Sequence, residues 1–589
     1  MPFGAMIDDG GVLFQLWAPA AKRVDLQLLE PARTLAMRRT EEGWYHLGVG
    51  NLGAGARYHF LINGEQHVPD PASRYQPQDV HGPSEVIDAE AFDWDDQSWT
   101  GRPWREAVIY ELHLGTFTRE GTFAAATAEL GRLAELGVTA IELMPLADFP
   151  GRRNWGYDGV LPFAPDSVYG KPEELKRFIA AAHRLGLMVF IDVVYNHFGP
   201  EGNYLSLYAP QFFAPGETGW GQRINFDGAG AQHVRRFFIH NALYWLIEYH
   251  ADGLRFDAVH AIHDESERHF LRQLADRVRQ TIAGRRQIHL ILENDRNEAS
   301  FLQRDAGSVP LYDAQWNDDF HHACHVLLTG EGGGYYGDYA SAPLDHLGRA
   351  LTEGFAYQGD FSAYRDCKRG EPSRHLPPLA FVHFLQNHDQ IGNRAFGERL
   401  TTLATPAALA AATAMLLLAP APPLLFMGEE WGATAPFLFF CDFKGELGAA
   451  VRDGRRREFA RFPAFASPDA RERIPDPLDL RTFERSCLDR TQFNSDIATR
   501  YRALLALRQR EIVPHLTERA PRQTRYEVKG SRLDAEWQFE DDATLRLIAN
   551  LGEMPTQSET LPSGWRQLWG PKPRGATLDP WTVVWSIKP

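Results

Sequence analysis

The chain has 589 residues, more than one ordinary hydrophobic core supports, so several domains are expected. Hydrophobic residues make up 44% and charged residues 23%, which is typical of a folded protein and excludes a disordered one. The formal net charge of -16 argues against nucleic acid or an anionic membrane as a partner, because both attract basic surfaces.

The ends of the chain and its cysteines indicate a cytoplasmic protein. Residues 1–9 have neither a basic start nor an apolar stretch, so no signal peptide is expected. The apolar stretch 407–427 is interrupted by prolines, which predicts a buried helix followed by a buried strand rather than a membrane span. The cysteines are widely spaced and are interpreted as reduced: Cys324, Cys367, Cys441 and Cys487. We expect a monomer or a simple homo-oligomer.

Residues 1–98 carry short β patterns separated by turn residues, which predicts a small β-sandwich. The Pro-rich stretch 70–77 is expected to lie extended and to lead out of it. At the other end, residues 501–589 are expected to form a helix followed by a second small β-sandwich.

Residues 99–500 alternate strand and helix patterns. Helices are predicted at 122–136, from 171 onward and at 234–249, and stretches 198–224 and 296–378 are expected to be loop insertions. The predicted strands are 108–113, 139–144, 187–194, 254–259, 288–293, 379–389 and 423–430. Such alternation predicts either a doubly wound sheet or a (β/α)₈ barrel.

The positions of the polar residues favour the barrel. A barrel gathers the carboxyl ends of its strands into one site, and no Gly-x-Gly-x-x-Gly follows the first strand to support a dinucleotide-binding fold. Polar residues fall at or just beyond the ends of apolar strands: Asp192, Asn196, His197, Arg255, Asp257, Glu293, His388 and Asp389. We therefore predict a (β/α)₈ barrel with a site built from these residues.

Arg255 and Asp257 lie two apart in a short strand, so their side chains are expected on the same face. The arginine is expected to lower the pKa of Asp257 and to keep the carboxylate ionised. A structural salt bridge is the commoner meaning of an isolated Arg-x-Asp. The coincidence of so many polar groups at strand ends argues for a functional site here.

Two carboxyl groups on one cleft are the minimum for hydrolysis of a glycosidic bond. Glu293 ends an apolar strand, where burial raises the pKa of a carboxyl group and suits a proton donor, whereas Asp257 is expected to be the ionised partner. Asp389 supplies a third acid that can stabilise positive charge on the sugar. No His-Glu-x-x-His or Cys-x-x-Cys occurs, so neither a metal nor another cofactor is expected, although calcium held by loop oxygens stays open.

Four runs resemble, in order, the four conserved regions of the α-amylase family: 192–197, 253–260, 293–294 and 386–389. The resemblance implies a retaining (β/α)₈ glycosidase or transglycosylase that acts on α-glucans. It implies that Asp257 is the nucleophile, Glu293 the acid/base and Asp389 the transition-state stabiliser. It also implies substrate binding by His197, Arg255, His388, Tyr157, Asp192, Asn196 and His260.

Within that family, runs 70–74, 81–84, 315–322 and 436–440 resemble the maltooligosyltrehalose trehalohydrolases. This likeness implies an amino-terminal, carbohydrate-binding-like domain as in branching and debranching enzymes. It also implies cleavage of the α-1,4 bond next to a terminal trehalose unit. The candidates for the wall that contacts the trehalose end are Trp316, Asp318, Asp319 and Phe320, although the same run also fits a capped loop helix.

Two alternatives stay open. A glycogen branching enzyme would share the four conserved runs and the first domain, but it would transfer the glucan to a hydroxyl group instead of to water. A catalytically inactive barrel would be expected to lack one of the three carboxylates, and here Asp257, Glu293 and Asp389 are all present.

Overall fold

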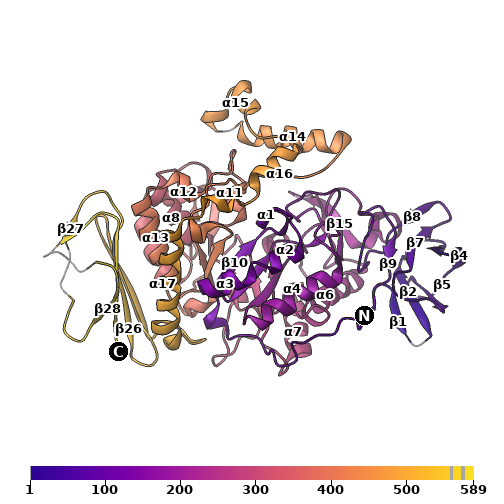
Figure 1. Ribbon diagram of the computed structural model, residues 1–589, viewed down its shortest axis with the longest axis horizontal. Coiled ribbons are helices and arrows are strands. Elements are labelled where there is room, and N and C mark those ends of the chain that lie inside the picture. The colour runs from indigo at the N-terminus through magenta and orange to yellow at the C-terminus, as the bar shows by residue number, and fades with distance from the viewer. Residues whose placement is uncertain (1, 9, 220, 461, 558–560, 572–576) are drawn as a thin grey trace.

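Eight parallel strands close into a barrel at the centre of the computed structural model, with β-rich parts on either side (Figure 1). The structure describes residues 1–589 except 1, 9, 220, 461, 558–560 and 572–576. The barrel strands are β10 (Ile109–Leu112), β11 (Ala140–Leu143), β14 (Met188–Val193), β17 (Gly253–Phe256), β18 (His289–Leu292), β19 (Ala314–Trp316), β22 (Phe381–Phe384) and β23 (Pro423–Phe426). Strand β23 pairs with β10 and closes the circle, so the predicted (β/α)₈ barrel is confirmed.

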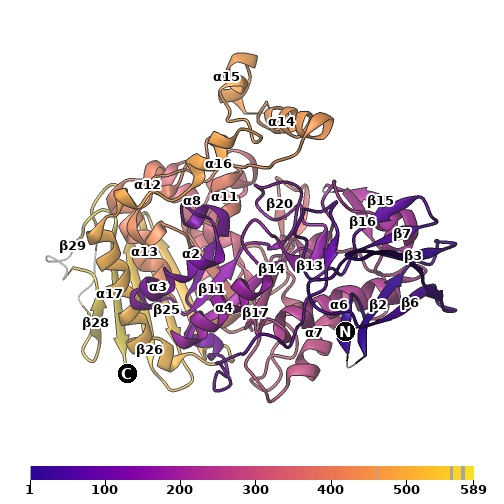
Figure 2. The same cartoon turned by 45° about the vertical axis from the view of Figure 1, so that its right-hand side comes forward.

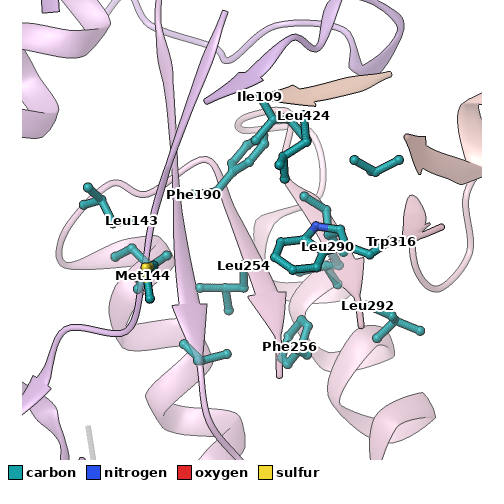
Figure 3. Packing of buried hydrophobic residues seen from close by; sticks show 14 of the residues in the cluster. Ile109, Leu143, Met144, Phe190, Leu254, Phe256, Leu290, Leu292, Trp316 and Leu424 are labelled. Atoms are coloured by element: carbon teal, nitrogen blue, oxygen red, sulfur yellow. The ribbon is translucent and has the colours of Figure 1, made fainter. Parts of the chain in front are cut away.

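The barrel strands are buried along their whole length, which explains their continuous apolar sequences. Phe190, Leu254, Leu290 and Trp316 are among the buried side chains that pack at neighbouring strands (Figure 3). Each large apolar side chain buried in this way contributes roughly 1.5–3 kcal/mol. The register places Arg255 beside Asp192, so the polar ends of neighbouring strands meet.

Helices surround the barrel strands. The helix predicted at 122–136 is two helices, α2 (Phe123–Thr127) and α3 (Leu130–Leu136). Helix α4 (Pro172–Arg184) begins after Lys171, whose backbone N–H donates to Glu174 at 2.8 Å, and α6 (Ala231–Ile247) and α7 (Phe270–Ile282) follow. The apolar stretch 407–427 forms the helix α13 (Pro406–Leu418) and strand β23.

In the part of the chain that the structure describes, no helix has both the length and the apolar character needed to cross a membrane.

Residues 296–378 are not the loop insertion that the sequence predicts. They contain barrel strand β19 and the helices α8 (Asp318–Thr329) and α10 (Pro343–Glu353). Strand β19 was not predicted because it has only three residues, too few to show a hydrophobic periodicity.

The amino-terminal part contains two facing antiparallel sheets (Figure 2). One has the strands β1 (Met6–Asp8), β2 (Gly11–Trp17), β6 (Trp44–Gly50) and β5 (Arg38–Arg39). The other has β4 (Ala32–Ala36), β3 (Val24–Leu29), β7 (Arg57–Ile62) and β8 (Gln66–Val68), and β9 (Ser84–Glu85) pairs with β7. Residues 70–77 do not lead out of this part as an extended segment, because they contain turns and the chain returns as β9. Within them, Arg74 contacts Glu248 at the end of α6 at 3.3 Å.

The carboxy-terminal part is a five-stranded antiparallel sheet with a small two-stranded sheet beside it. The large sheet has β24 (Gln523–Lys529), β25 (Arg532–Gln538), β26 (Thr544–Asn550), β30 (Thr582–Lys588) and β28 (Arg566–Trp569). The small sheet has β27 (Thr556–Gln557) and β29 (Thr577–Leu578). The boundary predicted at 500/501 falls inside helix α17 (Ser495–Glu511), which packs on α13; the domain boundaries stay predictions.

A helical arm projects from the barrel near the carboxyl ends of its strands. It contains α14 (Gly445–Phe459), α15 (Pro468–Glu472) and α16 (Leu480–Ser486), and both views show α14 and α15 standing away from the body (Figures 1 and 2).

Candidate active site

A cleft of about 590 Å³ opens where the barrel strands end. Asp257, Glu293 and Asp389 all line it, although they come from the ends of three different strands. Of the other predicted site residues, the cleft is lined by Tyr157, His197, His260, His388 and Asp318. Asp192, Asn196 and Arg255 lie beneath this surface and are buried.

Arg255 forms the floor of the site, and its side chain is 0% exposed. One terminal nitrogen lies 2.6 Å from Asp192 Oδ2 and 3.0 Å from Asp257 Oδ1, and the other lies 2.6 Å from Glu293 Oε2. The indole of Trp316 lies 4.1 Å from the guanidinium on another side. A buried cation is tolerated here because three carboxyl groups surround it.

Asp257 and Glu293 are therefore held by a single guanidinium. The sequence predicted only that Arg255 and Asp257 share a face and that the strand ends meet in one site. Asn196 also donates a hydrogen bond to Asp257 Oδ2 at 3.0 Å. Burial raises the pKa of Asp257, and Arg255 opposes this shift without reversing it. The expectation that the arginine lowers the pKa below its ordinary value is wrong, because burial has the larger effect.

Burial also raises the pKa of Glu293, Arg255 lowers it, and the neighbouring Asp257 raises it further. The backbone N–H of Ala258 donates to Glu293 Oε2 at 2.8 Å. The raised pKa is the property that the apolar strand before Glu293 predicts. A raised pKa is the direction that a proton donor requires.

Asp389 sits in the first turn of α11 (His388–Gly392), where Asn387 caps the helix by accepting from Asp389 N at 2.9 Å. Its carboxyl group is 36% exposed and faces the cleft. His388 Nε2 lies 3.4 Å from Asp389 Oδ1, and His388 Nδ1 pairs with Glu111. Burial lowers the pKa of His388, but Asp389 and Glu111 together raise it to about 9. The imidazole is therefore charged at neutral pH.

Tyr157 connects the sides of the cleft. Its hydroxyl donates to Asp192 Oδ2 at 2.7 Å, and its ring stacks on His388 with centroids 5.0 Å apart. His197 Nε2 lies 3.0 Å from the carbonyl oxygen of Tyr157. The ring of Tyr157 is only partly buried, so it presents an aromatic face to the cleft.

Three of the four candidates for the trehalose wall do not reach the cleft. Trp316 is 1% exposed beneath Arg255, Phe320 stacks on His383 at 4.3 Å, and Asp319 pairs with Arg369. The run begins helix α8, which is the alternative meaning noted from the sequence. Of the four candidates, only Asp318 lines the cleft. Burial, and to a lesser extent the charge of Glu293, raises the pKa of Asp318 well above its ordinary value.

Sequence reasoning missed two acids inside the barrel, Glu111 and Glu142. Each interrupts an otherwise apolar strand, and that interruption was the available signal. Neither carboxyl oxygen of Glu142 has a hydrogen-bond partner in the described part of the chain. Burial, reinforced by Glu111, raises the pKa of Glu142 well above its ordinary value, which favours the neutral form.

Phe439, from the run 436–440 that carried part of the resemblance, also lines the cleft. Three further wall residues come from segments that carried no motif: Tyr335, Arg365 and Arg455. Over the described residues, no cluster of three or more His, Cys, Asp or Glu side chains has a geometry that would hold a metal ion.

Three family models match parts of the chain. Residues 2–77 match carbohydrate-binding module 48, also described as the isoamylase N-terminal domain. Residues 89–209 match the alpha amylase catalytic domain, and residues 521–585 match a domain of unknown function.

Curated relatives match most of the chain. A malto-oligosyltrehalose trehalohydrolase from Saccharolobus solfataricus is 42% identical over 509 residues, 86% of this chain and 87% of that protein. One from Deinococcus radiodurans is 43% identical over 516 residues, 86% of this chain and 83% of that protein. A 1,4-alpha-glucan branching enzyme from Vibrio parahaemolyticus is 35% identical over 274 residues, only 42% of this chain and 36% of that enzyme.

Solved structures share the whole architecture. A candidate α-amylase from Salmonella typhimurium superposes with a TM-score of 0.94 at 45% identity, and the match covers 100% of this chain and 99% of that one. A pullulanase from Paenibacillus barengoltzii has a TM-score of 0.71 at 21% identity, covering 100% of this chain and 94% of that one, which shows a shared fold.

Proposed function

This chain belongs to the malto-oligosyltrehalose trehalohydrolase family, and we propose that it performs the reaction for which those relatives are named. It is a glycosidase of the α-amylase type. The substrate that we infer is an α-1,4-glucan chain that ends in trehalose. Hydrolysis of the bond next to that unit releases trehalose and a maltooligosaccharide, which places the enzyme in trehalose formation.

We assign the chemistry to three carboxyl groups. Asp257 attacks the anomeric carbon while Glu293 gives its proton to the departing trehalose oxygen, and a covalent glycosyl-enzyme forms. Glu293, now ionised, then takes a proton from water as the water attacks the same carbon. The ester bond to Asp257 breaks, and the configuration at the anomeric carbon is retained. Asp389 stabilises the positive charge that develops on the sugar ring.

The single observation that carries this assignment is the shared guanidinium of Arg255. It contacts Asp257 at 3.0 Å through one nitrogen and Glu293 at 2.6 Å through the other, on a cleft that Asp389 also lines. Arg255 and Asn196 stabilise an ionised Asp257, and the charge of Asp257 raises the pKa of Glu293. We assign the proton of the pair to Glu293, as the first step requires.

We propose that specificity for the trehalose end comes from polar groups at the far wall of the cleft, with Asp318 as the predicted residue that lines it. Trehalose joins two glucoses through both anomeric carbons, so it bends away from the path of a maltose unit. An ordinary glucan end would leave polar groups at this wall unpaired, and unpaired buried groups discriminate strongly.

The test is product analysis with two substrates of equal length. With maltotriosyl trehalose, we expect trehalose and maltotriose as the main products. Maltopentaose lacks the trehalose unit, and we expect its kcat/KM to be lower by more than about 100-fold, as when a substrate lacks a required hydrogen-bonding group. Comparable kcat/KM values would leave a general α-amylase-type hydrolase in place of the trehalohydrolase. New α-1,6 branches on linear glucan would instead identify a branching enzyme.

We also propose a cytoplasmic location. All four cysteines belong to the described residues and are free, which supports a reducing compartment.

A further inference from the structure

Arg455 of helix α14 reaches from the projecting arm to the loop that carries Asp389. Its side chain is only 8% exposed, although it lines the cleft. One terminal nitrogen donates to two backbone carbonyl oxygens, that of Gly392 at 2.6 Å and that of Arg394 at 3.1 Å. The arm is therefore attached to the main body directly behind helix α11.

The carbonyl oxygen of Gly392 belongs to the peptide group before Asn393, and that of Arg394 to the peptide group after Arg394. The side-chain amide of Asn393 donates to Asp389 Oδ1 at 3.3 Å. Holding both carbonyl groups restricts the backbone of the two residues between them, Asn393 and Arg394, and hence the direction of the Asn393 amide. A continuous chain of contacts thus runs from the arm to the carboxyl group that we assign as transition-state stabiliser.

We propose that Arg455 is a positioning residue, which holds Asp389 in its catalytic orientation through Asn393. The proposal rests on the role given to Asp389 in the proposed function. Arg455 does not need to touch the substrate for this role.

Other contacts hold the guanidinium of Arg455 in place. It lies 4.7 Å from the ring centroid of Phe459 and 5.5 Å from that of Phe439, and its other terminal nitrogen lies 3.3 Å from Glu458. Phe459 and Ile474 of the arm also form a small apolar cluster with Ala395, just beyond Asn393. These contacts join α14 to the segment that carries Asp389, although α14 and α15 otherwise project from the body (Figure 2).

The loop itself has little freedom at this point. A Cβ on Gly392 would lie 2.1 Å from the ring of Trp155, so the backbone packs directly against that indole. Trp155 in turn contacts Phe439 at 5.3 Å and His388 at 5.6 Å between ring centroids. A shift of Gly392 would therefore disturb Trp155 and, through it, His388, which contacts Asp389. The contact between Arg455 and Gly392 thus affects the surroundings of Asp389.

A lysine cannot replace this arginine in the proposed role. The planar guanidinium serves two carbonyl groups with one nitrogen and Glu458 with another, whereas an ammonium group is a single compact centre. Arg455→Lys keeps the positive charge and most of the aliphatic part of the side chain. It therefore removes the planar arrangement of donors with little loss of packing.

The first experiment measures kcat, KM and the melting temperature of Arg455→Lys beside the wild type and Arg457→Ala. Arg457 is an exposed residue of the same helix and is the matched control. We expect kcat of Arg455→Lys to fall about 10- to 100-fold, the loss typical of a broken hydrogen bond to a charged group, with KM within about twofold. The control is expected to match the wild type. An unchanged kcat, or a change confined to KM, would overturn the proposal.

The second experiment is a double-mutant cycle with Asn393→Ala. If Arg455 acts through Asn393, then Arg455→Lys has little further effect on kcat in the Asn393→Ala background. Additive effects would mean that Arg455 acts independently of Asn393, and they would refute the proposal. Should Arg455→Lys fail to fold, Arg455→Gln, which retains one donor group, takes its place in the same cycle.

Failure of the proposed function would look different. The cycle is measured on whichever α-glucan the wild type cleaves, so its outcome does not depend on trehalose being the product. A wild type that releases no trehalose refutes the substrate assignment. If the wild type cleaves a substrate, but Arg455→Lys leaves kcat unchanged or the two substitutions have additive effects, only the role of Arg455 is refuted.

Discussion

Arg255 determines much of the chemistry at the scale of single residues. Its guanidinium contacts Asp192, Asp257 and Glu293, and it is fully buried, so each of these acids has a charge partner within 3.0 Å. Burial nevertheless raises the pKa of both Asp257 and Glu293. The acids therefore differ by their neighbours rather than by the sign of the shift, since the side chain of Asn196 donates to Asp257 and the backbone N–H of Ala258 to Glu293.

Replacing Asp257 with Asn removes the nucleophile and keeps the shape of the side chain. We expect kcat to fall by several orders of magnitude while the melting temperature stays close to that of the wild type. Kinetics on maltotriosyl trehalose, together with thermal melting, provide the measurement. Activity within about tenfold of the wild type, or about 1.4 kcal/mol in the barrier, is too small a loss for a nucleophile.

Replacing Glu293 with Gln removes the proton donor. Natural glucans have poor leaving groups that need this proton, so we expect their hydrolysis to be nearly abolished. Aryl glycosides with good leaving groups need less protonation, and their first step is expected to lose much less. The comparison is the ratio of wild-type to variant rates for the two substrates, and equal ratios would argue against the assigned role.

At the scale of helices and strands, the local sequence pattern explains which parts of the site could be predicted. Glu293 followed a clear apolar run at the end of β18, and Asp257 was placed at the end of β17 by its alternation with Arg255. Glu111 and Glu142 were missed because they lie within such runs, where an inward and an outward position cannot be separated without the register. Trp316 and Phe320 were expected at the cleft, but they belong to the core. An aromatic side chain can pack against a sugar or in a hydrophobic core, and the sequence does not distinguish the two.

The walls supplied by Arg455 and Tyr335 could not be predicted either. Both residues come from segments distant in sequence from the conserved runs, and only tertiary packing brings them to the cleft. Sequence periodicity reports the local face of an element, and it contains no information on which distant loop will cover that face.

A pH-dependent contact joins two barrel elements, because His388 of α11 pairs with Glu111 of β10. Since Asp389 and Glu111 raise the pKa of His388 from 6.5 to about 9 against the effect of burial, charged His388 stabilises the folded state. The sign follows from linkage: a raised folded-state pKa gives stability that is fully present below the unfolded pKa and lost as the pH rises through the folded one.

We therefore expect the advantage in melting temperature of the wild type over His388→Gln to be full near pH 6 and to shrink as the pH rises through about 9. Thermal melting of both proteins across that range is the measurement. A difference that stayed constant with pH would mean that His388 does not titrate there.

On the scale of the whole molecule, the barrel and the carboxy-terminal sheet share one buried core. Trp585 of β30 donates to the carbonyl oxygen of Ala414 in α13 at 3.1 Å, and Trp537 of β25 donates to that of Leu351 in α10 at 3.2 Å. The two indoles stack on each other at 5.8 Å between ring centroids. The sheet is therefore packed on the barrel helices through large apolar side chains with satisfied polar atoms.

This shared core predicts how the protein unfolds when the contact is weakened. Trp585→Ala removes a fully buried indole, which typically costs about 3–5 kcal/mol, and it leaves the cleft untouched. Because the lost packing belongs to both parts, we expect the barrel and the sheet to unfold together at a lower temperature, with activity lost in the same transition. Trp581→Ala, on the partly exposed neighbour in the same part of the chain, is the control and is expected to have a much smaller effect. Calorimetry with parallel activity measurements decides the outcome, since two separate transitions, with activity surviving the first, would show that the sheet is an independent unit.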